Sequence, residues 1–155
     1  IFWQAWKERP CDVPMSGYYK WDRQRTPAWP RFIQRQDGRV LLAAGLWETW
    51  KGEDGAFLHS FTLLTGPNAS IPQPLTQDGP SFLGAKEALA WLAGRFRTPA
   101  ALARHAEKPL LESYPVSRAI RDAGRDDYTL LEPVDPDDPA LGAPAGPEDD
   151  IDDDE

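Results

Sequence analysis

Apolar and polar positions recur along the chain with two periods, and the pattern predicts the order of its elements. Residues 1–9 place their apolar side chains at helical spacing, and Pro10 ends this helix. The segment 11–21 is short and rich in turn residues, with Gly17 ahead of an aromatic pair. We therefore expect a helix followed by a strand or the entry to one.

A tight hairpin is predicted next. Residues 31–36 and 39–47 both have strand character, and Asp37-Gly38 separates them. Asp-Gly accepts the positive φ that a two-residue hairpin turn requires, so we expect these two strands to pair. A further strand is predicted at residues 60–65, which are β-branched and apolar.

Two helices are predicted in the second half. The three prolines within residues 71–82 favour an ordered loop ahead of them. Residues 84–96 repeat apolar side chains at i, i+3, i+4 and i+7, which predicts an amphipathic helix with one face on the core. That face consists of Leu89, Leu92, Ala93 and Phe96. Thr98 and Pro99 offer an N-cap and a first-turn proline for a second helix that reaches about His105.

The last part of the chain predicts short closing strands at residues 114–117 and 128–134. Strands, then two helices, then strands indicate an α+β fold with a mainly antiparallel sheet and flanking helices. After Val134 the sequence buries too little apolar area to repay its ordering entropy. We expect one domain over residues 1–134 and a disordered acidic tail over residues 135–155.

Charge is distributed unevenly between these two parts. The formal net charge is -8, yet all 17 Lys and Arg lie between Lys7 and Arg125, and residues 135–155 hold ten acids and no base. The body is therefore weakly basic and compatible with phosphate contacts.

The single cysteine, Cys11, excludes an internal disulfide and leaves too few thiols for a standard structural zinc site. We expect no metal or cofactor. No apolar run is long enough to span a membrane and no leader precedes the body, so we expect a cytoplasmic, at most nucleoid-associated, monomer. Because the first residue is Ile1 and not Met, we interpret the chain as starting inside a larger frame.

Three stretches carry a resemblance to a known family. Residues 9–21, RPCDVPMSGYYKW, are similar to the segment RCLIPADGFYEW. Residues 44–50, AGLWETW, and 61–65, FTLLT, resemble AGLWE and FTILT. YPVS at residues 114–117 and LLEP at 130–133 resemble YPVS and LIEP. In this order and spacing, the chain resembles the C-terminal part of a SOS response-associated peptidase (SRAP) domain.

The resemblance implies an SRAP-like fold and a role in DNA damage, with single-stranded or abasic DNA as the partner. Members of this family condense an N-terminal cysteine with the ring-opened abasic sugar to form a thiazolidine. That residue and the part of the domain that would precede this region are missing here. Cys11 matches the internal cysteine of the first segment, which we interpret as a small buried side chain.

The other catalytic positions implied by the resemblance are replaced. Lys20 stands where GFYEW has its glutamate, and a cation cannot act as that base. Residues 74–80, PLTQDGP, match the loop PIHDRMP, so that Thr76 replaces the histidine and Asp78 an arginine that would meet a phosphate. No catalytic position is intact, and we expect a degenerate member. A fragment with no selected role, left with unpaired hydrophobic strands, is the plainer interpretation.

Two further hypotheses remain open. The body could be a non-catalytic nucleic-acid or partner-binding module that its acidic tail regulates by competing in cis for a basic groove. The residues considered for stacking on bases, for which core packing is the other interpretation, are Tyr18, Tyr19, Trp21 and Trp29. The residues considered for phosphate contacts are Arg23, Arg25 and Arg31. Lys20 could also form a Schiff base with an abasic aldehyde. Glu48, His59 and His105 are assigned to no catalytic role.

Overall fold

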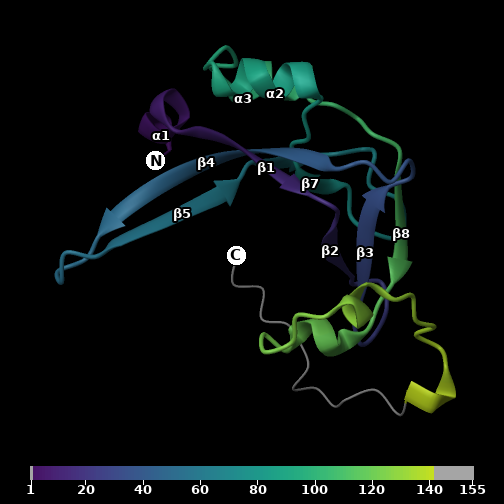
Figure 1. Cartoon of the computed structure of the whole chain (residues 1–155). Coiled ribbons are helices and arrows are strands. Elements are labelled where there is room, and N and C mark those ends of the chain that lie inside the picture. The colour runs from purple at the N-terminus through teal and green to yellow at the C-terminus, as the bar shows by residue number, and fades with distance from the viewer. Residues whose placement is uncertain (1, 142–155) are drawn as a thin grey trace.

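The computed structural model describes residues 2–141, and within them an α+β fold is built from antiparallel strands and flanking helices, as predicted (Figure 1). The strands are β1 Pro10–Met15, β2 Tyr18–Asp22, β3 Trp29–Arg35, β4 Leu41–Lys51, β5 Phe57–Leu63, β6 Thr65–Pro67, β7 Asp78–Pro80 and β8 Leu111–Pro115. The helices are α1 Trp3–Glu8, α2 Ala85–Leu92 and α3 Pro99–His105, with 3-10 turns η1 Arg118–Arg121, η2 Tyr128–Leu131 and η3 Pro139–Leu141.

Strand β4 lies at the centre of one sheet, in the order β1-β4-β5, and a second sheet has the order β2-β3-β8. The alternating side chains of β4 serve two cores. Ala44 and Leu46 pack with helices α2 and α3, whereas Leu41 and Ala43 pack with Ile33 of the second sheet. A single strand therefore joins the helical layer to the second sheet.

The hairpin predicted around Asp37-Gly38 is wrong, although the turn itself forms. Gly38 has φ +72°, and its N–H donates to the Arg35 carbonyl at 3.1 Å. The strands on either side do not pair with each other, because β3 pairs with β2 and β8 while β4 pairs with β1 and β5. Burial decides this outcome: Ile33 and Leu41 enter one core from different sheets, and both are at most 1% exposed.

Helix α2 forms within the predicted range of residues 84–96 but ends at Leu92, before Gly94 with its positive φ, and the predicted buried face is only partly right. Leu89 and Leu92 are 70% and 47% exposed, whereas Ala88 and Trp91 are buried. Trp91 offers more apolar area than a leucine, and its indole N–H donates to the Cys11 carbonyl at 3.0 Å. Trp91 therefore determines which side of α2 faces β4. Helix α3 begins as predicted, with the Thr98 hydroxyl accepting from the N–H of Ala101.

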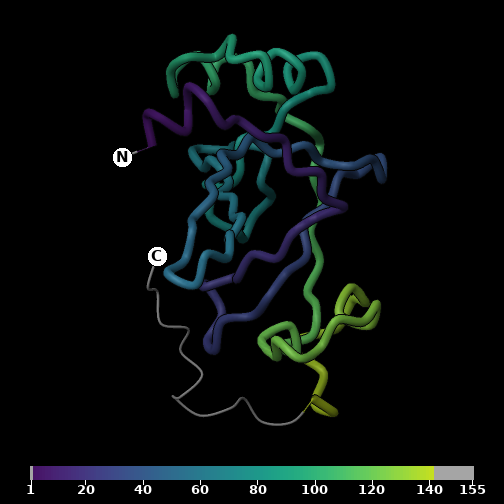
Figure 2. The backbone as a smooth tube through the Cα atoms, turned by 60° about the vertical axis from the view of Figure 1, so that its left-hand side comes forward, coloured from purple at the N-terminus to yellow at the C-terminus, as the bar shows by residue number. Residues whose placement is uncertain are grey.

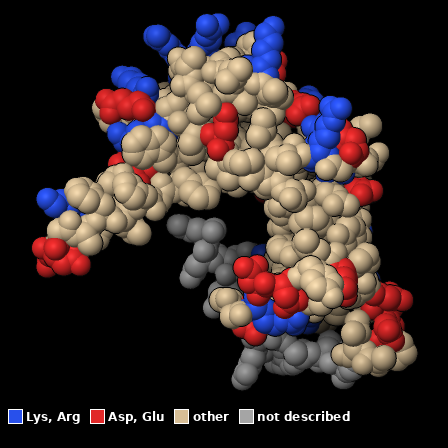
Figure 3. Space-filling view, in the orientation of Figure 1, with Lys and Arg blue, Asp and Glu red and all other residues tan. Residues whose placement is uncertain are grey.

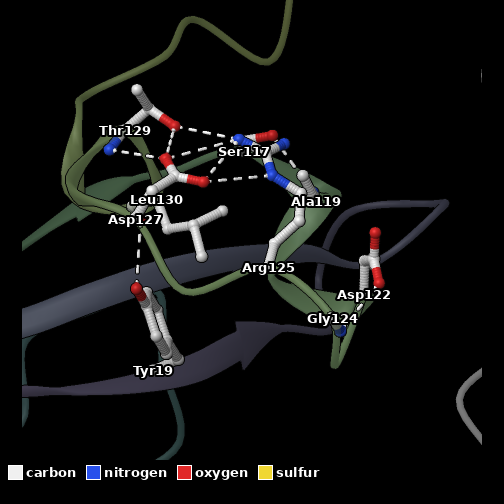
Figure 4. A network of polar contacts seen from close by, with 9 residues as sticks. All are labelled: Tyr19, Ser117, Ala119, Asp122, Gly124, Arg125, Asp127, Thr129 and Leu130. Carbon is white, nitrogen blue, oxygen red and sulfur yellow. Dashed lines mark hydrogen bonds and ion pairs between the residues drawn. The ribbon is translucent and has the colours of Figure 1, made fainter.

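The closing segment departs from the prediction at residues 128–134, which contain no strand; Tyr128–Leu131 form the 3-10 turn η2. Asp127 caps this turn by accepting from the backbone N–H of Thr129 at 3.0 Å (Figure 4). The Tyr19 hydroxyl donates to the Leu130 carbonyl at 3.2 Å, which fastens the turn to β2. Side-chain caps and a tyrosine thus satisfy groups that a strand would have paired. Residues 142–155 of the predicted tail lie outside the described residues.

The far halves of β4 and β5 form a two-stranded arm, residues 47–61, that projects from the body (Figure 1). Several large apolar side chains of the arm are exposed: Trp50 by 62%, Phe57 by 63%, Leu58 by 60% and Phe61 by 61%. Among residues 2–141, no strand pairs with the outer edge of β5. An open edge with exposed aromatic side chains favours association with other chains.

We expect the double substitution Phe57→Ser and Leu58→Ser to raise the solubility of the chain and its monomeric fraction. The cost in unfolding free energy should stay below about 1 kcal/mol, because only cross-strand contacts are lost. Trp91→Ala opens a core cavity and should lower the free energy of unfolding by about 3–5 kcal/mol. Urea titration measures the free energies of unfolding of both variants. Sedimentation velocity measures the first effect, and an unchanged aggregate content would contradict it.

Candidate functional site

Lys20, Thr76 and Asp78, the positions that the family resemblance predicts to be replaced, come together where β2 meets the start of β7. The Lys20 ammonium donates to the Asp78 carboxylate, with Nζ to Oδ1 at 3.0 Å, and to the Asp78 backbone carbonyl at 2.5 Å. Thr76 also forms a side-chain hydrogen bond with the Asp78 carboxylate. The Lys20 side chain is 18% exposed and that of Asp78 is 72% exposed. The site thus pairs a largely buried lysine side chain with a solvent-exposed carboxylate.

The loop between β6 and β7 holds Thr76 and Asp78 in place. Its apolar residues Ile71 and Leu75 are buried in the core shared by the two sheets, and the register pairs Pro67 with Asp78. A Cβ at Gly79 would lie 2.9 Å from Ile71 Cδ1. A larger residue at this position would therefore displace the end of the buried Ile71 side chain.

Tyr18 completes the cluster, and sequence reasoning considered it only for base stacking. Its hydroxyl is buried and has no hydrogen-bond partner among the described residues. Burial, with a contribution from the Asp78 charge, raises the pKa of Tyr18 to about 12. Hydrogen bonds from Thr76 and then Lys20 lower the pKa of the Asp78 carboxyl. At neutral pH the cluster holds a protonated phenol and a carboxylate that two donors already occupy.

The residues predicted to contact nucleic acid lie on the β2–β3 hairpin, where Trp29, Arg31 and Arg25 contact other parts of the chain. The indole N–H of Trp29 donates to the Val116 carbonyl at 2.9 Å, and the Arg118 guanidinium lies 5.7 Å from its ring centroid. Arg31 donates to the side chain and carbonyl of Ser113. Arg25 forms an ion pair with Asp137.

Trp21 is half-buried in β2 and Arg23 is exposed after it. The hairpin thus gathers all five predicted side chains. Contacts to the β8 region hold Trp29 and Arg31, so these two join parts of the fold. A role of the set in nucleic-acid binding stays a prediction.

The other side chains with reactive groups, Cys11, Glu48 and His59, are engaged in packing or in hydrogen bonds within the fold. Cys11 is half-buried in β1, and burial followed by the charge of Asp12 raises the pKa of its thiol. Such a thiol is not activated as a nucleophile. Glu48 accepts from Arg9 at 2.8 Å, and His59 Nδ1 lies 2.9 Å from the Thr49 hydroxyl.

Cys11 borders a hollow of about 470 Å³ at the root of the arm. The residues that line the hollow are Cys11, Asp12, Val13, Pro14, Trp47, His59, Ser60 and Phe61. The described residues contain no group of three His, Cys, Asp or Glu side chains placed to hold a metal ion. No helix within residues 2–141 has the length and apolar character to cross a membrane.

Comparisons with known proteins agree with the resemblance seen in the sequence. The family model described as SOS response associated peptidase (SRAP) matches residues 1–123. An abasic site processing protein of Saccharomyces cerevisiae is 36% identical over 59 residues, which are 38% of this chain and 15% of the yeast protein. The chain therefore spans a small part of that relative.

Solved structures share the fold. A crystal structure of a protein from Bacteroides thetaiotaomicron has a TM-score of 0.71 and 19% identity, covering 84% of this chain and 59% of that one. A protein from Bordetella bronchiseptica has a TM-score of 0.57 and 25% identity, covering 74% and 58%. A phage-related protein of the same organism has a TM-score of 0.55 and 21% identity, covering 76% and 57%. The chain spans less than two thirds of each of these structures.

We expect Lys20→Glu to destabilise the chain by about 0.5–1 kcal/mol, because two carboxylates would then face each other near the surface. Adding Asp78→Arg should restore most of this loss by re-forming the ion pair with opposite polarity. Urea unfolding at low ionic strength measures the cycle, and 1 M salt should shrink the coupling. Purely additive effects would contradict the coupling.

The same pair gives a pH dependence. A carboxyl whose pKa is lowered on folding adds stability above its unfolded pKa, about 3.9. This contribution disappears as the pH falls through the folded pKa of Asp78. In Asp78→Asn the fall in stability below pH 4 should therefore be shallower.

Proposed function

The chain belongs to the SOS response associated peptidase (SRAP) family, and we propose that it acts on DNA in abasic-site processing without cross-linking chemistry of its own. Its part is then to associate with damaged DNA, or with a partner that handles it. The name of the yeast relative supports the link to abasic sites.

The observation that carries this proposal is the pairing of Lys20 with Asp78. The family resemblance requires a carboxylate at position 20 to accept and return a proton, and an ammonium has no lone pair for that role. Both hydrogen bonds of the Lys20 ammonium end on Asp78. Thr76, at the position of the family histidine, bonds to the same carboxylate and cannot act as an imidazole would.

The same contacts argue against a Schiff base at Lys20. A nucleophilic lysine needs a neutral amine, as a desolvated or cation-rich pocket provides. Here the nitrogen lies 3.0 Å from a carboxylate oxygen that is itself solvated. The neighbour of Nζ is thus an anion and not the cations of such a pocket, so covalent chemistry at this position has no support from its neighbours.

We expect no covalent product when the chain is incubated with single-stranded DNA that carries one abasic site and is run on a denaturing gel. The longest product of its gene, tested beside it, should also give none, since it shares Lys20 and Thr76. Borohydride should likewise trap no adduct. A stable cross-link from the longer product, or a trapped band that Lys20→Ala abolishes, would overturn the proposal.

A second candidate function is the non-catalytic binding module regulated by acidic residues, and one contact favours it. Asp137, in the segment predicted as acidic tail, forms an ion pair with Arg25, one of the arginines predicted to meet phosphates. The hydrogen bond that the Arg25 guanidinium donates to Asp137 is the leading cause that raises the pKa of Arg25. An acid of this segment thus occupies a cation that DNA would otherwise neutralise.

We expect Asp137→Asn to tighten binding of single-stranded DNA by about threefold or more at low salt, because it frees one phosphate-binding cation. Glu53→Gln at the tip of the arm removes one negative charge far from Arg25 and serves as the matched control. Fluorescence anisotropy measures both variants. Equal effects of the two would reduce the role of Asp137 to net charge.

A further inference from the structure

Basic side chains gather on the outer side of α2, α3 and the segment between them (Figure 3). Residues 84–108 hold five Lys and Arg against two acids. The cations are Lys86, Arg95, Arg97, Arg104 and Lys108, and all five are exposed. Within the part of the chain that the structure describes, no salt bridge engages any of them.

The local structure turns these cations outward. Phe96 is 8% exposed and packs in the helical core, so the arginines on either side of it, Arg95 and Arg97, point away from the core. The Phe96 ring stacks on His105 at 4.6 Å between centroids, which brings the end of α3 beside this segment. Arg104 precedes His105 on α3 and joins the same surface.

The two acids of the stretch do not neutralise the surface. Glu107 accepts from Arg35 at 3.2 Å and is half-buried. The Glu87 carboxylate lies over Gly84, where a Cβ would meet its Oε2 at 2.8 Å, and Gly84 is the N-cap of α2. A carboxylate at this end of a helix is stabilised by the helix dipole. Glu107 is therefore paired with an arginine outside the stretch, and Glu87 lies at the N-terminal end of α2.

We propose that this α2–α3 surface binds the phosphate backbone of nucleic acid without reading its sequence. Exposed, unpaired cations spread over two helices provide the sequence-independent electrostatic contact that phosphates require. The inference rests on the DNA part of the proposed function and extends it to a new surface. The arm is a weaker candidate for this partner, because its tip carries Glu53 and Asp54.

An anionic membrane fits this surface less well than nucleic acid. A helix that lies in a membrane interface turns its aromatic and leucine side chains toward the lipid. Here Trp91 and Phe96 face the core, and only Leu89 and Leu92 of α2 are exposed large apolar groups. Two leucines on an eight-residue helix give little apolar area for insertion.

The surface is separate from the residues that the sequence predicts for DNA. Helices α2 and α3 lie at one end of the molecule in both views, and the turns η1 and η2 lie at the other (Figures 1 and 2). Trp29, of the predicted set, is held at the η1 end by its contacts to Val116 and Arg118. Variants of the two regions can therefore be tested independently.

The test compares two double variants that lose the same charge. Arg95→Gln with Arg97→Gln removes cations from the surface, and Arg39→Gln with Lys51→Gln removes exposed cations from other elements. Binding of an unmodified dT30 oligonucleotide is measured by anisotropy from about 20 to 200 mM salt. The slope of log K against log salt is negative, and we expect the surface variant to reduce its magnitude by about 1.4, at about 0.7 per lost phosphate contact. The control should change it by less than half of that.

Additional measurements separate the possible outcomes. Adding Arg104→Gln to the surface variant should reduce the magnitude of the salt slope further, and thermal unfolding of each variant checks that the fold persists. Equal losses in the surface and control variants overturn the inference while leaving DNA binding intact. No binding of dT30 by the unaltered chain overturns both the inference and the DNA part of the proposed function. Binding to phosphatidylserine vesicles but not to dT30 assigns the surface to lipid and overturns the inference.

Discussion

The alternation of β4 between two cores is the constraint on which the rest of the structure depends. Ala43, Ala44 and Leu46 are at most 2% exposed, on opposite faces of one strand. The small residues let a helical layer approach from one side and the second sheet from the other. Backbone bonds then attach the neighbouring segments: Ala44 N–H to Ser81 at 2.9 Å and Leu83 N–H to Leu42 at 2.8 Å. Asp78 lies close to β2 because β7 leads directly into this attachment.

Indole groups provide a second set of ties across the fold. The N–H of Trp6 donates to the Phe96 carbonyl, that of Trp29 to Val116 and that of Trp91 to Cys11, at 2.8–3.0 Å. In each case donor and acceptor are at least 80 residues apart in sequence. A tryptophan can bury a large ring and still satisfy its donor in this way. Packing and hydrogen bonding within the fold therefore account for these three tryptophans.

Local signals predicted much of the fold, and long-range choices account for the errors. The Thr98-Pro99 start of α3 and the turn at Gly38 follow from one or two residues, and both form. The pairing of β3 and β4 failed because a turn sequence does not specify which sheet its flanking strands join. The leucine face of α2 failed because helical periodicity does not weigh Leu89 against Trp91.

Sequence comparison identified the replaced positions of the candidate site, but it did not show that they touch. Lys20 and Asp78 are 58 residues apart, and the antiparallel pairing of β6 with β7 places Asp78 beside Lys20. The unpartnered Tyr18 hydroxyl was missed for the same reason, since burial by the loop is a tertiary property.

Under the proposed function, the ion pair explains how chemistry can be lost at this place without loss of the fold. A glutamate or histidine removed alone would leave its former partner unsatisfied, which is costly when a group is half-covered. Here the lysine at the glutamate position finds its counter-charge at the position of the family arginine, and Thr76 adds a neutral hydrogen bond. The contact between β2 and β7 is satisfied, while the group at position 20 is a cation and not a carboxylate base. In the proposed function, fold and catalysis therefore depend on different properties of the same three positions: the fold needs opposite charges in contact, and the chemistry that the family resemblance implies needs a base at position 20.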